Sequence, residues 1–131
     1  MSYNSVFKPG LFSGQTIIVT GGGSGIGRCT AHELAHLGAH VVLVGRSLGK
    51  LQATQAEITG DGGEASYHSC DIRDEEAVKA MVAAVLAERG RIHHLVNNAG
   101  GQFPAPLSMI NQKGFEAVVR NNLVGGFLIA R

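Results

Sequence analysis

The sequence has few cysteines, no long apolar run and little charge, and each shortage excludes a class of protein. Only two cysteines, Cys29 and Cys70, occur in 131 residues, which is too few for a disulfide scaffold and is typical of a reduced cytosol. The segment 1–14, MSYNSVFKPGLFSG, lacks an apolar core with a basic flank, so we expect no signal peptide. No apolar run is long enough to cross a membrane, which takes about 18 residues or more. We therefore expect a cytoplasmic protein with no membrane partner.

Charged residues make up only 16% of the chain, against about 25% in an average globular protein. Eleven Lys and Arg face ten Asp and Glu, which argues against nucleic acid as a partner. Apolar residues reach 44%, which is ample for a core and excludes a disordered chain. A small domain has a high surface-to-volume ratio and should be rich in charge. We therefore expect this chain either to bury extra surface against a partner or to be a piece of a larger fold.

Short apolar runs alternate with segments of helical spacing along the whole chain. Strands are predicted over 15–20, 40–44, 65–70 and 92–96, where short runs are bounded by turn residues. Helices are predicted over 26–37, 47–59 and 74–89, with a fourth beginning near Ser108 or Asn111. Their expected inner faces are Ile26, Thr30, Leu34 and Leu37, then Leu48, Leu51 and Ile58, then Val78, Met81, Val82, Val85 and Leu86. Ser47 and Asp74 are expected to cap two of these helices. This alternation predicts an α/β fold, a parallel sheet of about four strands with helices on both faces.

A glycine-rich segment, TGGGSGIG at 20–27, joins the first predicted strand to the first helix. Glycines let the backbone approach a ligand closely, and a helix N-terminus offers free N–H groups to a phosphate. The P-loop pattern fails here, because Arg28 and Cys29 stand where Lys and Ser or Thr are needed. The pattern G-x-G-x-x-G fits in no register. The pattern T-G-x-x-x-G-x-G fits fully, and the alternative is a glycine turn that holds no ligand.

Four segments together resemble the short-chain dehydrogenase/reductase family. They are TGGGSGIG at 20–27, CDI at 70–72, LVNNAGG at 95–101 and NNLVGGF at 121–127. The segments follow the family's order and cover essentially the whole chain. The resemblance implies one NAD(P)-binding Rossmann domain over residues 1–131. It also implies a small-molecule substrate and, for a complete protein, a homo-oligomer, with a tetramer expected.

The resemblance implies a role for each matching residue and no metal site. The cofactor-binding residues in these segments would be Thr20, Gly21, Ser24, Gly25, Ile26, Gly27, Asp71, Ile72, Asn98, Ala99 and Gly100. The glycine loop would hold the pyrophosphate, Asp71 would accept the adenine amino group, and 98–100 would line the ribose. Asn122 would be the catalytic Asn that supports a proton-relay water. The alternatives are that Asp71 only caps a turn and that Asn122 is an ordinary polar residue of a helix.

The residues after the second predicted strand favour NADP over NAD. NAD enzymes usually carry an acid there that binds the ribose 2′-OH, but this chain has Gly45 at that position. Arg46 can pair with a 2′-phosphate as a planar fork, and Ser47 can add a hydroxyl. The alternative is that Arg46 is only a solvated surface charge.

The segment 32–36 matches H-E-x-x-H, a zinc metalloprotease motif. Its two histidines, His32 and His36, share one helix face, but they fall outside the expected inner stripe of that helix. A catalytic zinc also needs a third protein ligand, and the neighbouring sequence offers none. We therefore expect two solvent-facing histidines here and no metal.

One family motif is absent, the Tyr-x-x-x-Lys pair that serves most members as general acid and base. Phe7 and Asp71 stand four residues after Tyr3 and Tyr67, where Lys is needed. A full doubly wound fold has two βαβαβ halves, about twice this length. We therefore expect only the first half of that fold, cut within the helix that carries Asn122, and no turnover by this chain alone.

The expected function is NADP-dependent hydride transfer by the complete protein, with this chain as its cofactor-binding half. The stretch NNAGGQFPAPLSMINQKGFEAV at 97–118 resembles the enoyl-CoA and dienoyl-CoA reductase branch, which implies an acyl-CoA or another lipid-like substrate. A terpenoid alcohol such as citronellol is the competing substrate class. The alternative function is a non-catalytic dinucleotide-binding module, and a P-loop ATPase or GTPase is a third and weaker possibility.

Overall fold

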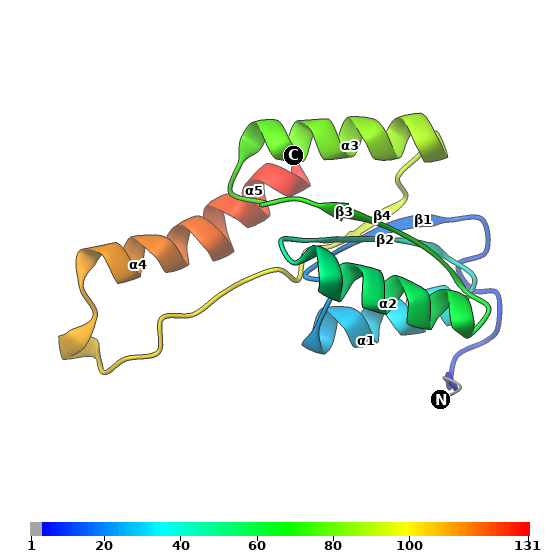
Figure 1. The fold of residues 1–131 in the computed structure, drawn as a ribbon, viewed down its shortest axis with the longest axis horizontal. Helices are drawn as coiled ribbons and strands as arrows, with labels where there is room; N and C mark the ends of the chain where they lie inside the picture. The colour runs from blue at the N-terminus through cyan, green and yellow to red at the C-terminus, as the bar shows by residue number, and fades with distance from the viewer. Residues whose placement is uncertain (1–3) are drawn as a thin grey trace.

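The computed structural model describes residues 4–131 and arranges them around a four-stranded parallel sheet (Figure 1). In chain order the strands and main helices are β1 (Thr16–Thr20), α1 (Gly25–His36), β2 (His40–Gly45), α2 (Leu48–Gly60), β3 (Glu64–Ser69), α3 (Glu75–Arg89), β4 (His94–Val96), α4 (Gln112–Val119) and α5 (Gly125–Ala130). The strand order is β3-β2-β1-β4. Strands β2 and β3 are added on one side of β1, and β4 is added on its other side. The order in which strands are added therefore reverses at β1, although all strands run parallel. The predicted α/β fold is confirmed.

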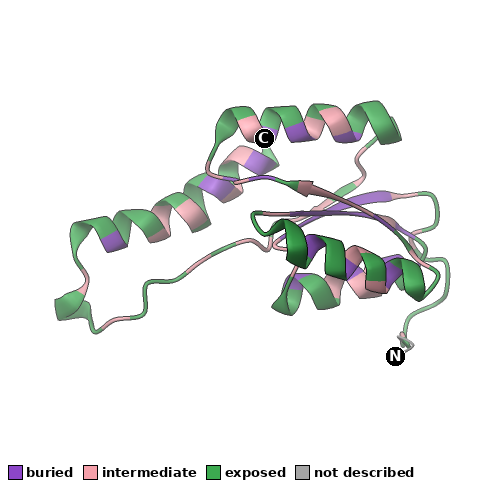
Figure 2. Ribbon diagram, in the orientation of Figure 1, coloured by how far each residue is buried: buried purple, intermediate pink, exposed green. Residues whose placement is uncertain are grey.

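Alternate residues of the central strands contribute to two separate cores. One core lies under α1 and α2 and contains Ile17, Val19, Val41, Leu43, Ala31, Ala35, Leu51 and Ile58. The other lies under α3 and α5 and contains Ile18, Val42, Val44, Val78, Met81, Val85 and Ile129. Figure 2 shows the buried strands between these two helix layers. Successive side chains of a strand point to opposite faces, so burial on both faces explains why the middle of each strand, 17–19 in β1 and 41–44 in β2, is apolar.

The predicted inner face of α1 is wrong by about one residue over most of the helix, although Leu37 is buried and Leu34 packs against the core as expected. The structure buries Gly27, Ala31 and Ala35, whereas Ile26, expected inside, is 79% exposed. Small side chains at these three positions allow α1 to lie close to the sheet. Apolar periodicity gives most weight to large apolar residues, so it predicted a helix face next to the one that packs on the sheet.

The ends of α2 and α3 agree only in part with prediction. Asp74 caps α3 as expected, because its carboxylate accepts hydrogen bonds from the backbone N–H groups of Glu76 and Ala77 at 3.0 and 3.1 Å. Ser47 occupies the N-cap position of α2, but its side chain makes no capping hydrogen bond. Leu48 and Leu86, expected on inner faces, are exposed. Leu48 is the first residue of α2, and Leu86 lines an open apolar groove between α3, β4 and α5.

The chain after β4 leaves the main body and returns as a long interrupted helix (Figure 1). Asn111 caps α4 by accepting from the N–H of Gly114 at 2.8 Å, as one of the two predicted starts. A π-helical turn, Arg120–Val124, joins α4 to α5 and contains both Asn121 and Asn122. Within residues 4–131, no helix combines the length and hydropathy needed to cross a membrane.

Candidate functional site

A groove of about 790 Å³ lies at the carboxyl ends of β1, β2, β3 and β4. Most of the predicted cofactor residues line it: Gly21, Ser24, Gly25, Ile26, Arg46, Ser47, Asp71, Ile72, Asn98, Ala99 and Gly100. In open α/β sheets, ligands bind outside the carboxyl ends of the strands, where the strand order reverses. The groove is in that place, because β4 and β2 flank β1 on opposite sides.

The glycine loop forms one wall of the groove. Gly21 has a φ of +68°, a conformation that residues with a Cβ rarely adopt, and its N–H donates to the carbonyl of Val44 at 2.7 Å. Ser24, the N-cap of α1, makes no side-chain capping bond, and the first turn carries no acidic residue. The first N–H groups of α1 therefore meet no side-chain acceptor from the N-cap, which suits an anion.

Gly27, one of the predicted cofactor residues, lies behind the groove and sets its shape. A Cβ at Gly27 would stand 2.3 Å from the carbonyl oxygen of Gly21 and 2.5 Å from Nδ2 of Asn98. The first turn of α1 can therefore approach the loop only without a side chain. Gly27 acts through packing and does not line the groove.

Thr20, also predicted at the cofactor, is fully buried and joins β1 to the segment after β4. Its Oγ1 accepts hydrogen bonds from the N–H groups of Asn98 and Ala99 at 3.0 and 2.9 Å. Asn98 in turn donates from Nδ2 to the carbonyl of Thr20 at 2.9 Å. These three bonds hold the second wall of the groove, residues 98–100, against the glycine loop.

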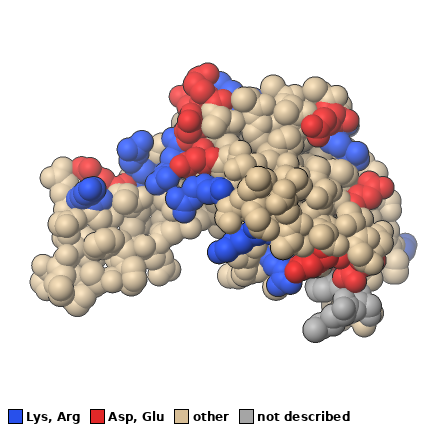
Figure 3. Space-filling view, in the orientation of Figure 1, with Lys and Arg blue, Asp and Glu red and all other residues tan. Residues whose placement is uncertain are grey.

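Basic side chains form the end of the groove beyond β2. Arg46 and Ser47 line it as predicted, and Lys50 joins them from the first turn of α2. In Figure 3, Lys and Arg side chains gather on this side of the molecule, between the main body and the α4 segment. Sequence reasoning missed Lys50, although a signal was present. A lysine in the first turn of a helix faces the positive end of the helix dipole, which is unfavourable unless an anion lies there.

Asp71 lines the groove at the end of β3 and is held by Arg73. The guanidinium of Arg73 lies 2.6 Å from Oδ2 through Nη2 and 2.9 Å from Oδ1 through Nε. The backbone N–H of Arg73 also donates to Oδ1 at 3.0 Å. The Arg73 hydrogen bonds lower the pKa of Asp71 to about 2. Asp71 therefore caps a turn, as the alternative expected, and it also lines the groove.

Asn122 does not line the groove, whereas its neighbour Asn121 does. The Nδ2 of Asn122 donates to the carbonyls of Gly101 and Val118 at 2.7 and 2.9 Å, and its Oδ1 accepts from the N–H of Gly101 at 3.2 Å. The side chain therefore ties the loop after β4 to the π-helical turn. A catalytic role for Asn122 stays a prediction.

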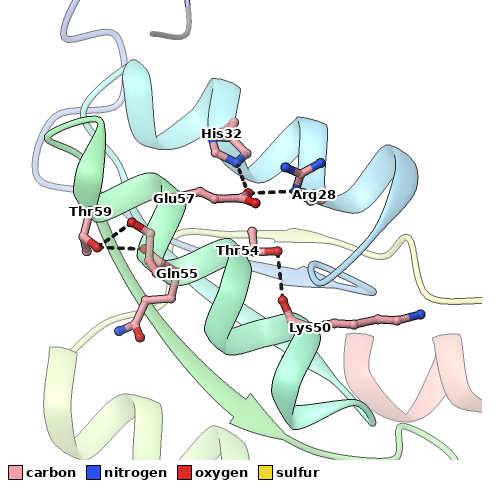
Figure 4. A network of polar contacts seen from close by, with 8 residues as sticks. Arg28, His32, Lys50, Thr54, Gln55, Glu57 and Thr59 are labelled. Atoms are coloured by element: carbon pink, nitrogen blue, oxygen red, sulfur yellow. Dashed lines mark hydrogen bonds and ion pairs between the residues drawn. The ribbon is translucent and has the colours of Figure 1, made fainter. Parts of the chain in front are cut away.

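The H-E-x-x-H segment lies on α1, and its first histidine, His32, points toward α2 (Figure 4). The prediction that both histidines face solvent is wrong for His32, whose side chain is only 14% exposed. Its Nε2 lies 3.0 Å from Oε2 of Glu57, which also accepts from Nε of Arg28 at 2.8 Å. These two hydrogen bonds lower the pKa of Glu57. Between residues 4 and 131, no group of three or more potential metal ligands is brought together.

The comparison with known families agrees with this arrangement. The family model for short chain dehydrogenases matches residues 15–131. The chain belongs to the short-chain dehydrogenase family.

Two curated members of the short-chain dehydrogenase family show the range of named activities. A 2,5-dichloro-2,5-cyclohexadiene-1,4-diol dehydrogenase of Sphingobium indicum is 43% identical, over 88% of this chain and 46% of its own length. A peroxisomal 2,4-dienoyl-CoA reductase of Rattus norvegicus is 35% identical, over 98% of this chain and 44% of its own. This chain thus spans about half the length of the curated relatives that it matches.

Solved short-chain dehydrogenase structures match the fold closely. A citronellol catabolism dehydrogenase of Pseudomonas aeruginosa has a TM-score of 0.94 and 73% identity, over 98% of this chain and 53% of that one. A metagenomic oxidoreductase in complex with NADP has a TM-score of 0.85 and 43% identity, over 92% and 55% of the two chains. An NAD⁺-bound xylitol dehydrogenase has a TM-score of 0.87 and 35% identity, over 91% and 46%. The fold is therefore Rossmann-like, and the family binds nicotinamide dinucleotides of both kinds.

Proposed function

We propose that this chain binds NADP in the groove and that the whole protein is an NADP-dependent oxidoreductase. The nicotinamide would donate or accept the hydride. The observation that carries the choice of NADP is the basic end of the groove, where Arg46 and Lys50 lie with no acidic side chain at position 45. A 2′-phosphate there would meet two cations, the Ser47 hydroxyl and the N-terminus of α2.

The remaining groove residues would bind the rest of the dinucleotide. The N–H groups at the start of α1 would hold the pyrophosphate, and Gly25, where a Cβ would meet nothing within 4 Å, would leave room for its approach. Asp71 and Ile72 would flank the adenine ring, and the wall at 98–100 would line the ribose. In the whole protein, Asn122 would support a proton-relay water.

The acid and base for proton transfer are not supplied by a Tyr-x-x-x-Lys motif in these 131 residues. Tyr67 lies in β3 and packs against the core under α1 and α2, where its hydroxyl accepts a hydrogen bond from Gln52 at 3.3 Å. It does not line the groove. Hydride transfer is therefore proposed for the whole protein, and a role as a dinucleotide-binding module is proposed for this chain by itself.

For the substrate we propose a lipid-like molecule, an acyl-CoA or a terpenoid alcohol. Two similar proteins are named for such chemistry, a citronellol catabolism dehydrogenase and a 2,4-dienoyl-CoA reductase. The loop after β4 supports the proposal, because Phe103, Leu107 and Met109 expose large apolar side chains there. Phe103 also packs on Gly114 of α4, where a Cβ would stand 2.9 Å from its ring, so this loop is held against α4.

A calorimetric titration with NADP⁺ and NAD⁺ tests the proposed cofactor. We expect NADP⁺ to bind with a Kd about tenfold lower or better, because charge-assisted hydrogen bonds to a phosphate contribute roughly 1.5–3 kcal/mol. The double variant Arg46→Ala, Lys50→Ala should lose that preference and keep its affinity for NAD⁺. Lys8→Ala, which removes a lysine before β1, is the matched control. Equal or tighter binding of NAD⁺ by the unmodified chain would overturn the proposal.

A further inference from the structure

Arg73 does not line the groove, but it holds the side chain of Asp71, which does. Its guanidinium and its backbone N–H all donate to the carboxylate of Asp71. On its other side Arg73 borders a separate cavity of about 420 Å³, together with Lys113 and Glu116 of α4 and Arg120 of the π-helical turn. Arg73 thus stands between the groove and that cavity, with Asp71 shared by both.

The hydrogen bonds from Arg73 leave little freedom to the Asp71 side chain. A carboxylate offers about four acceptor positions. Oδ1 is taken by the backbone N–H and Nε of Arg73, and Oδ2 by Nη2 and a longer contact of 3.2 Å to Nε. The side chain of Asp71 is still 35% exposed and lines the groove. Because Nε is shared between the two oxygens, three donors of Arg73 occupy about three of these positions, and room remains for one more donor at a fixed place.

We propose that Arg73 is a positioning residue that fixes Asp71 to accept one hydrogen bond from the exocyclic amino group of adenine. The inference rests on the proposed function, because it needs a dinucleotide in the groove. Arg73 makes the groove select an adenine base, which carries an amino group at position 6, over hypoxanthine, which carries a carbonyl there. A carbonyl oxygen facing the fixed carboxylate would place acceptor against acceptor.

The fork geometry explains why an arginine stands at this position. A planar guanidinium binds both carboxylate oxygens at once, and a lysine ammonium acts as a point charge that fixes no plane. Arg73 also lowers the pKa of Asp71 to about 2, so the carboxylate stays an acceptor even in mildly acidic solution. Without the bidentate hydrogen bonds from Arg73, the Asp71 carboxylate can rotate and adjust to adenine or to hypoxanthine.

The test compares the Kd of NADP⁺ with that of its deamino analogue, in which hypoxanthine replaces adenine. We expect the unmodified chain to prefer NADP⁺ about tenfold, in line with the loss of one hydrogen bond to a charged group. Arg73→Ala should lower this ratio to about threefold or less, and Arg73→Lys should give an intermediate ratio. The preference for NADP⁺ over NAD⁺ should stay unchanged in both variants, because the 2′-phosphate end is untouched. Arg91→Ala, which removes an arginine before β4 at the opposite edge of the sheet, is the matched control.

The outcomes separate this inference from the proposed function. If Arg73→Ala weakens NADP⁺ and the deamino analogue equally, Arg73 only supports the turn and the inference is overturned. If Arg73→Ala does not fold, the Arg73→Lys variant decides. The inference is overturned if Arg73→Lys prefers NADP⁺ over the deamino analogue as strongly as the unmodified chain does. If the unmodified chain binds neither dinucleotide, the proposed function itself fails.

Discussion

Replacement of Gly27 by alanine is expected to lower the free energy of unfolding by about 2–3 kcal/mol and to weaken NADP⁺ binding about tenfold or more. The new Cβ would stand 2.3 Å from the backbone oxygen of Gly21 and 2.5 Å from Nδ2 of Asn98. Neither neighbour can yield easily, because Asn98 is bonded to Thr20 and Gly21 to Val44. The glycine loop must therefore move away from α1. Urea denaturation and calorimetric titration measure the two effects.

Gly49→Ala is the control for this variant. Gly49 lies in the first turn of α2, and a Cβ there would meet nothing within 4 Å. Alanine in a helix is favoured over glycine by up to about 1 kcal/mol, so this variant should be no less stable than the unmodified chain. An equal loss of stability in both variants would show that close packing at Gly27 is not the cause.

Gly45→Asp is expected to reverse the cofactor preference from NADP⁺ to NAD⁺. A carboxylate at the end of β2 can accept hydrogen bonds from a ribose 2′-OH but repels a 2′-phosphate. We expect NADP⁺ binding to weaken about tenfold to hundredfold, as two like charges in contact near a protein surface require. Position 45 accepts the side chain, because a Cβ there would meet Leu51 at an ordinary 3.4 Å. Titrations with both dinucleotides provide the measurement.

Gly45→Asn separates charge from shape in this experiment. Asparagine has the size of aspartate but no charge, so it should leave the preference for NADP⁺ largely in place. If Gly45→Asn weakens NADP⁺ as much as Gly45→Asp does, steric exclusion explains the result and the electrostatic account of this end of the groove is wrong.

Much of the groove could be predicted from the sequence because its parts depend on local backbone chemistry. The glycines over 20–27 indicate close approach of the backbone between strand and helix, and the structure has φ values of +68° at Gly21 and +52° at Gly25. The apolar runs of β1 and β2 are buried on both faces, so their position and type were clear. Asp74 lies just before an apolar helical pattern, and it caps α3. Each of these patterns determines the structure of residues that lie only a few positions away in the sequence.

The rest depends on contacts between segments, which periodicity does not contain. The burial of Ala31 and Ala35 requires knowing how closely α1 approaches the sheet. The pairing of His32 with Glu57 requires the placement of α2 beside α1. Thr20 matches a cofactor motif, yet its hydroxyl accepts from the segment after β4, 78 residues further along the chain. Long-range contacts of this kind decide which motif residues face the ligand and which only support it.

Backbone amide NMR spectra recorded during a titration with NADP⁺ test the central claim most directly, because they show where the dinucleotide binds. The account predicts that the largest shift changes fall on Gly21, Ser24, Gly25, Arg46, Ile72 and residues 98–100. It predicts no comparable change along the apolar groove of about 780 Å³ between α3, β4 and α5. Changes centred on that second groove, or a spectrum that NADP⁺ leaves unaltered, would contradict the assignment of the cofactor site.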